Sequence, residues 1–205
     1  MTRRPHENLE LIRRVLGDDY LELSIERLVV EEDLAAERSR VHVETSALGD
    51  KKKIVVEGSG VGFIDALVQG LLSRFAQEYK SLESIELSNF TVNADIDTTK
   101  SGQKGSDAVG EVTVEVRNSD QKLFRFSDSS RSVIASAARA VLAAVEYFVN
   151  AERAFIVLHK AREDAQRRNR TDLVTRYTRE LSEVVASTSY AEIIEKIRKD
   201  LGPKS

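Results

Sequence analysis

The stretch IVVEGSGVGFIDALVQGLLSRF, residues 54–75, constrains the fold more than any other part of the sequence. Its apolar start predicts a strand, and the apolar residues from Phe63 to Phe75 recur at the spacing of one helix face. Between them, residues 58–62 predict a tight turn, because glycine permits positive φ angles and close backbone approach. The helix start presents unpaired N–H groups and a positive dipole end, which suit a carboxylate or phosphate. The alternative is a junction whose glycines serve geometry alone.

The order of three strands followed by a helix occurs twice along the chain, which predicts an α+β fold of two βββα units. Residues 20–30 alternate like a strand, although the same residues would also suit a helix. The other predicted strands lie at residues 41–45, 54–56, 82–97 (one strand or two), 112–116 and 122–126, and the helices begin near Phe63 and Ser132. A polar loop is expected over residues 98–106.

Further helices are predicted at both ends of the chain. Residues 8–16 form an amphipathic pattern that stops at Gly17, and residues 155–159 can extend the second helix. Thr171 and Ser189 are candidate N-caps of two more helices. We therefore divide the chain into an N-terminal helical segment (1–17), a duplicated βββα domain (18–150) and a C-terminal helical extension (151–205).

Composition predicts an ordinary cytoplasmic protein. Of the 205 residues, 41% are hydrophobic and 32% charged, and the net charge of -3 gives no general attraction to nucleic acid or anionic membranes. The basic residues between Lys160 and Arg179 are better explained as a solvated helix face than as a nucleic-acid contact. There is no cysteine, no signal-peptide pattern and no apolar run of membrane-spanning length.

No pattern in the sequence predicts catalysis, a cofactor or a metal. The three histidines, at positions 6, 42 and 159, form no metal-binding pair. Ser59 lies between two glycines, but Glu57 occupies the place of the first glycine in a G-x-S-x-G nucleophile elbow. The glycines match neither a nucleoside-triphosphate loop nor a dinucleotide fingerprint set in repeated βαβ units.

Four motifs, in order, resemble the C-terminal regulatory domain of 2-isopropylmalate synthases, which citramalate synthases share. Residues 60–67 (GVGFIDAL) resemble its G-x-G-P-x-D-A signature. Leu87-Ser88-Asn89-Phe90 resembles an L-x-D-Y strand, and Gly105-Ser106-Asp107-Ala108 a G-x-D-A loop. Residues 135–145 resemble an A-S-x-x-A-l-x-A helix. The resemblance covers about residues 20–150.

The resemblance implies two βββα units, a homodimer, and an end-product effector (leucine or isoleucine) held between subunits. Carried across, the ligand-binding residues would be Gly60, Gly62, Asp65, Phe90, Ala94 and Ala108. The helix-start amides would hold the effector's carboxylate and Asp65 its ammonium; alternatively, Asp65 is a first-turn acid that stabilises the helix by about 0.3–1 kcal/mol.

The sequence also departs from the family pattern. Phe63 replaces a proline, Phe90 a tyrosine, and Glu146 an asparagine, and the second unit has Arg125-Phe126-Ser127 where glycines often repeat. The chain is too short to contain the catalytic (β/α)₈ barrel as well, which needs about 250 residues.

The leading hypothesis is therefore a non-catalytic sensor of branched-chain amino acids in leucine-type biosynthesis, which signals to a separately encoded synthase, with the C-terminal helices as the docking surface. A rival hypothesis is a dimeric scaffold that has lost the ligand. A third, an enzyme, would need converging polar groups away from the two helix starts.

Overall fold

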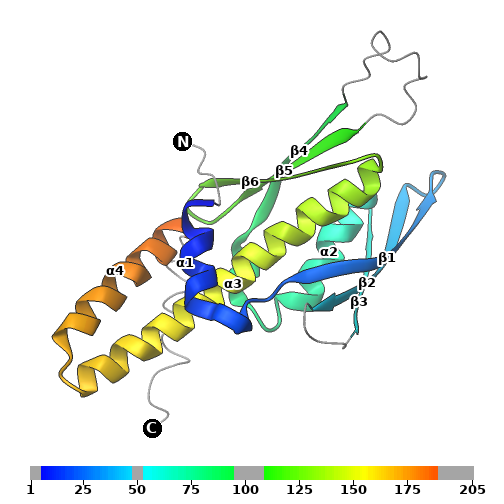
Figure 1. The fold of residues 1–205 in the computed structure, drawn as a ribbon. Coiled ribbons are helices and arrows are strands. Elements are labelled where there is room, and N and C mark those ends of the chain that lie inside the picture. The colour runs from blue at the N-terminus through cyan, green and yellow to red at the C-terminus, as the bar shows by residue number, and fades with distance from the viewer. Residues whose placement is uncertain (1–5, 48–52, 95–108, 189–205) are drawn as a thin grey trace.

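The computed structural model describes residues 6–47, 53–94 and 109–188 (Figure 1). The first unit contains β1 (Leu23–Asp33), β2 (Arg38–Ala47), β3 (Lys53–Gly60) and α2 (Phe63–Phe75), and the second contains β4 (Glu86–Ala94), β5 (Gly110–Arg117), β6 (Leu123–Ser130) and α3 (Val133–Arg167). Helix α1 (His6–Leu16) precedes them and α4 (Thr171–Thr188) follows. Short 3₁₀ turns lie at Gly17–Asp19 and Lys80–Ser84. The predicted α+β fold of two βββα units is confirmed.

The two units have matching sheets. Each is a three-stranded antiparallel sheet in sequence order, β1-β2-β3 and β4-β5-β6. The first strand of each sheet carries a bulge near its start, between Ile25 and Arg27 in β1 and between Leu87 and Asn89 in β4. The two units of the predicted internal repeat therefore share even this bulge in the first strand.

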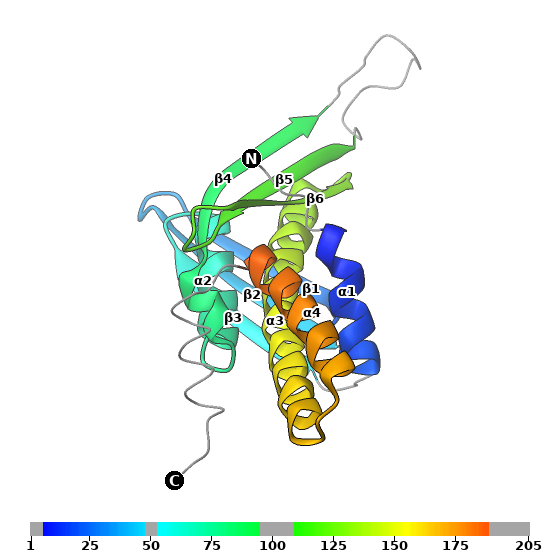
Figure 2. The same cartoon turned by 90° about the vertical axis from the view of Figure 1, so that its left-hand side faces the viewer.

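Helices fill the space next to both sheets. Helix α2 packs on β2 and β3 and against α3, while α3 packs on β5 and β6. Under the second sheet, Phe124 and Phe148 are completely buried and meet edge to face at 5.3 Å between ring centroids. Figures 1 and 2 show α1 and α4 beside the C-terminal half of α3, where Leu158, Leu181 and Val184 are buried.

Several predicted boundaries change in the structure. Residues 20–30 belong to a strand rather than a helix, but β1 begins only at Leu23. Part of the stretch 82–97 is a 3₁₀ turn, and β4 begins at Glu86. Helix α3 continues without a break past residue 150, where we placed a domain boundary, so the C-terminal extension starts inside a helix. The loop at residues 98–106 and the helix expected after Ser189 lie outside the described residues.

Candidate functional site

The junction between β3 and α2 is more extended than the sequence predicts. Strand β3 runs through Gly58 and ends at Gly60, so the turn contains only Val61 and Gly62. Gly62 has φ −163°, and Gly17 alone among the described glycines has a positive φ. The prediction that residues 58–62 form a turn with positive φ angles is therefore wrong.

Close backbone approach explains two of the three glycines. A Cβ atom on Gly58 would lie 2.0 Å from the carbonyl oxygen of Ala66, and one on Gly60 would lie 2.6 Å from the Ala66 nitrogen. Both strand positions must therefore lack a side chain for α2 to pack on β3. A Cβ atom on Gly62 would meet nothing within 4 Å, so the space at the helix start is open.

The first turn of α2 has unpaired donors. The first intrahelical bond runs from the Ala66 N–H to the Gly62 carbonyl at 2.9 Å, and the N-cap residue Gly62 has no side chain with which to cap the helix. The N–H groups that precede Ala66 consequently have no acceptor within the helix. They lie at the positive end of the helix dipole, an arrangement that favours an anionic ligand group.

Asp65 already has a structural role at this junction. Its Oδ2 atom accepts a hydrogen bond from the Val61 N–H at 3.1 Å, which fixes the turn before the helix. A carboxylate in the first turn also stabilises the helix dipole. The half-buried Asp65 side chain lines a cavity next to the junction as well, so one residue serves the turn and borders an open space.

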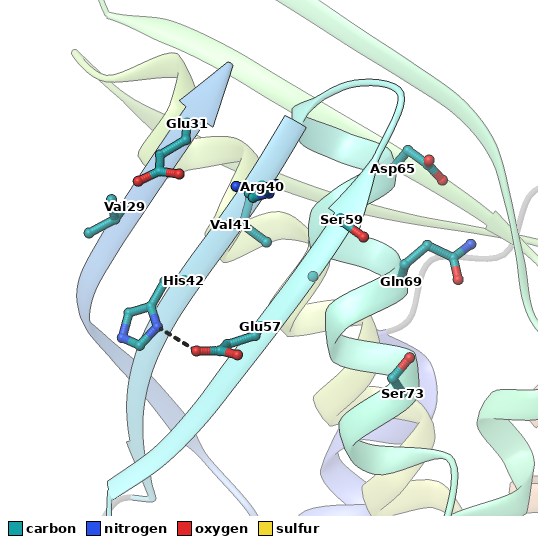
Figure 3. Close-up of a pocket in the computed structure, with 11 residues that line it drawn as sticks. Val29, Glu31, Arg40, Val41, His42, Glu57, Ser59, Asp65, Gln69 and Ser73 are labelled. Carbon is teal, nitrogen blue, oxygen red and sulfur yellow. Dashed lines mark hydrogen bonds and ion pairs between the residues drawn. The ribbon is translucent and has the colours of Figure 1, made fainter. Parts of the chain in front are cut away.

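The cavity, of about 830 Å³, runs from the outer surface of the first sheet to α2 (Figure 3). Its helix side carries Asp65, Gln69 and Ser73, which lie in a row four residues apart. On its sheet side, His42 Nδ1 lies 3.3 Å from Glu57 Oε1. The cavity is bordered by hydrogen-bonding and charged groups of both signs, and it suits a polar ligand group better than an apolar one.

Sequence patterns did not predict that Asp65 shares a cavity with Gln69, Ser73 and the pair of His42 and Glu57. The spacing of Asp65, Gln69 and Ser73 could have predicted that they lie on one face of α2, because residues four apart share a helix face. The contact between His42 and Glu57 depends on strand register, in which His42 pairs directly with Glu57. The His42 side chain itself is partly exposed.

The second helix start differs chemically from the first. Strand β6 ends at Ser130 and the turn contains only Arg131 and Ser132, so Ser130 and Ser132 take the places of Gly60 and Gly62. Residues 125–127, where the sequence comparison expects the glycines, correspond instead to residues 55–57 of β3, which precede its glycines. The Ser132 Oγ accepts from the Ala135 N–H at 3.2 Å. Side chains of the chain itself thus occupy this helix start.

The structure brings together only part of the predicted ligand-binding set. Gly60, Gly62 and Asp65 meet at the β3–α2 junction. Phe90 belongs to the other sheet, where it is half-buried on β4 opposite Val114, and Ala94 ends the same strand opposite Gly110. Ala108 lies outside the described residues. The assignment of these six residues to one ligand site stays a prediction.

The family model of the LeuA allosteric (dimerisation) domain matches residues 7–149, well over half of the chain. The chain belongs to the LeuA allosteric domain family. The match supports the resemblance to the regulatory domain of 2-isopropylmalate synthase that four short motifs indicated. It begins in α1 and ends within α3, so α4 lies beyond the matched LeuA domain. A comparison with curated proteins finds no match.

Membership of the LeuA family identifies the domain as an allosteric and dimerising one, not a catalytic one. Within the described ranges, no group of three or more histidines and acidic residues is placed to hold a metal ion. No helix in the same ranges combines the length and apolar character needed to cross a membrane.

Proposed function

We propose that this protein is a regulatory sensor that binds a branched-chain amino acid at the start of α2, as a homodimer. The observation that carries the proposal is the open, uncapped helix start. A Cβ atom at Gly62 would touch nothing within 4 Å, and the N–H groups before Ala66 have no acceptor in the helix. The second helix start, by contrast, is capped by Ser132.

In the proposed complex, the N–H groups of the first turn of α2 hold the effector's carboxylate, and Asp65 receives its ammonium group. Following the resemblance to the synthase domain, we propose that Phe90, Ala94 and Ala108 contact the effector's aliphatic side chain. Such an effector regulates only through a difference in its affinity for two arrangements of the protein. We further propose that the protein acts in the cytoplasm on a separately encoded synthase, which binds the arrangement of the protein that the effector stabilises.

The second copy of the chain would cover β4. This strand lies at the edge of its sheet, and its Leu87 and Val92 are 37% and 42% exposed. Both lie on the side of β4 whose β5 partners, Val116 and Val112, are buried. Exposed apolar residues on an edge strand are typical of an interface, and the matched LeuA domain is a dimerisation domain.

Calorimetric titration of the full chain with leucine, isoleucine and valine tests the proposal. We expect saturable binding of at least one of them. Gly62→Trp should abolish it, because a Cβ atom at Gly62 meets nothing within 4 Å and the indole ring would fill the open space at the helix start. Leu34→Trp is the matched control, since Leu34 is 85% exposed on the hairpin between β1 and β2.

Two results would contradict the proposal. One is the absence of saturable binding of all three amino acids to the folded protein. The other is binding that Gly62→Trp leaves intact.

A dimeric scaffold without a ligand is the second candidate. It is favoured by the hydrogen bond that Asp65 already accepts from the Val61 N–H, because this bond gives the acidic residue a structural role that needs no ligand. Flat titrations together with a dimer in sedimentation velocity would support the scaffold. Saturable binding that Gly62→Trp removes would exclude it.

A further inference from the structure

A second cavity, of about 500 Å³, lies between β1 and α3. Its α3 side carries small and apolar residues, including Ala135, Ala138 and Leu142, together with Arg139 and Glu146. Across from them lie Ile25 and Leu28 of β1. This volume falls in the range of small-molecule sites, about 300–1,000 Å³. We refer to it as the β1–α3 groove.

One charged residue of the groove lacks a counter-ion. The groove's other charged residues are paired: Glu26 with Lys53 at 3.5 Å, Arg27 with Glu44 at 3.5 Å, and Asp128 with Arg139 at 2.7 Å. Glu146 accepts a hydrogen bond from the Leu23 N–H at 2.5 Å, but within the described residues no lysine or arginine forms an ion pair with it. A carboxylate removed from water without an ion pair is costly, so a ligand that brings a positive charge would be favoured.

The titration behaviour of Glu146 agrees with that geometry. Burial raises its pKa to about 7, and the neighbouring carboxylate of Glu22 acts in the same direction. Arg13 opposes this rise, but it pairs with Glu22 at 3.8 Å. The remaining titratable neighbour is Tyr20, whose pKa is raised above its usual 10.0, chiefly by burial.

The internal repeat shows how the two units differ here. Because Ser132 takes the place of Gly62 at the helix start, Ala135 and Ala143 of α3 stand where α2 has Asp65 and Ser73. Two of the three polar helix positions of the first cavity are thus alanines in the groove. The third, Gln69, corresponds to Arg139, whose charge is paired with Asp128 at 2.7 Å. A ligand of the groove should accordingly have an apolar body and fewer polar groups than a zwitterionic amino acid.

We propose that the β1–α3 groove is a second ligand site, which binds a small primary amine with a branched aliphatic body. The ammonium group pairs with the Glu146 carboxylate and supplies the missing counter-ion. The aliphatic body lies over Ala138 and Leu142 and against Ile25. The site is independent of the helix start of α2, to which we assign the amino-acid effector.

Calorimetric titration of the full chain with 3-methylbutylamine, the amine that lacks leucine's carboxylate, tests this site. We expect saturable binding at pH 8, weakened at least tenfold by Glu146→Gln. The glutamine amide can still accept from the Leu23 N–H, so the variant removes the charge and keeps the contact. Glu163→Gln, on the same helix but outside the groove, should bind like the unmodified protein.

The pH gives a second readout. With a pKa of about 7, the ionised fraction of Glu146 falls about tenfold from pH 8 to pH 6, and amine binding should weaken by about the same factor. Ser24→Trp should also reduce binding, because Ser24 is an exposed groove residue on β1. Gly62→Trp should leave amine binding unchanged, which separates this site from the effector site. No saturable binding of the amine, or full binding by folded Glu146→Gln, would overturn the proposal.

Discussion

Replacing Glu146 by glutamine should change how the stability of the protein depends on pH. The Glu146 side chain lies between α3 and the start of β1, where it accepts from the Leu23 N–H. Burial raises its pKa from 4.5 to about 7, so the folded state favours the protonated carboxyl. The folded chain therefore binds more protons here than the unfolded chain, and the stability that Glu146 contributes falls as pH rises through this range.

The magnitude follows from the shift of about 2.5 pKa units between 4.5 and 7. One unit corresponds to about 1.4 kcal/mol, so the ionised carboxylate costs the folded state about 3 kcal/mol at pH 8. At pH 5 the cost is under about 1 kcal/mol, because only the unfolded chain is then substantially ionised. Glutamine carries no charge at either pH and keeps an acceptor for the Leu23 N–H.

Urea unfolding of the unmodified protein and of Glu146→Gln, each at pH 5 and pH 8, measures the effect. The free energy of unfolding of the variant, minus that of the unmodified protein, should be about 2–3 kcal/mol larger at pH 8 than at pH 5. All other titrating groups cancel in this difference. Equal pH dependence in the two proteins would refute the burial of a counter-ion-free carboxylate.

Three further substitutions test the packing and the interface. Gly58→Ala should lower the free energy of unfolding by more than about 2 kcal/mol, because its Cβ atom would lie 2.0 Å from the Ala66 oxygen. Gly62→Ala should change it by less than about 0.5 kcal/mol. Equal losses for the two variants in urea unfolding would refute the geometry of the junction. Ser132→Ala should cost about 1 kcal/mol in the same measurement, since the Ser132 Oγ caps α3, and no loss would show that the cap is unimportant. Val92→Asp should shift sedimentation velocity from dimer to folded monomer, and an unchanged dimer would place the interface away from β4.

Local patterns allowed much of the fold to be predicted. Apolar residues at helical spacing located the start of α2 at Phe63, and Ser132 marked the start of α3. Alternation favoured a strand over a helix for residues 20–30, and β1 confirms it from Leu23 onward. These features depend on residues close together in sequence, which is why a single sequence reveals them.

The errors arise where packing between elements decides the outcome. Gly58 and Gly60 indicated a turn, but they lie in a strand, and they lack a side chain because α2 packs closely on β3. The groove beside Glu146 depends on contact between β1 and α3, which are more than a hundred residues apart. The sequence showed only that Glu146 departs from the family pattern, and it gave no sign of the backbone group that Glu146 would bind.

Nuclear magnetic resonance of the ¹⁵N-labelled full chain, titrated with leucine, isoleucine and valine, tests most directly whether the start of α2 binds the carboxylate of an amino acid. If the start of α2 binds the carboxylate, the backbone amide signals of residues 62–65 should shift most and saturate with the binding curve. The amides at the serine-capped start of α3 should shift far less. Saturable shifts confined to other parts of the chain, with the signals of residues 62–65 unmoved, would contradict binding at the start of α2.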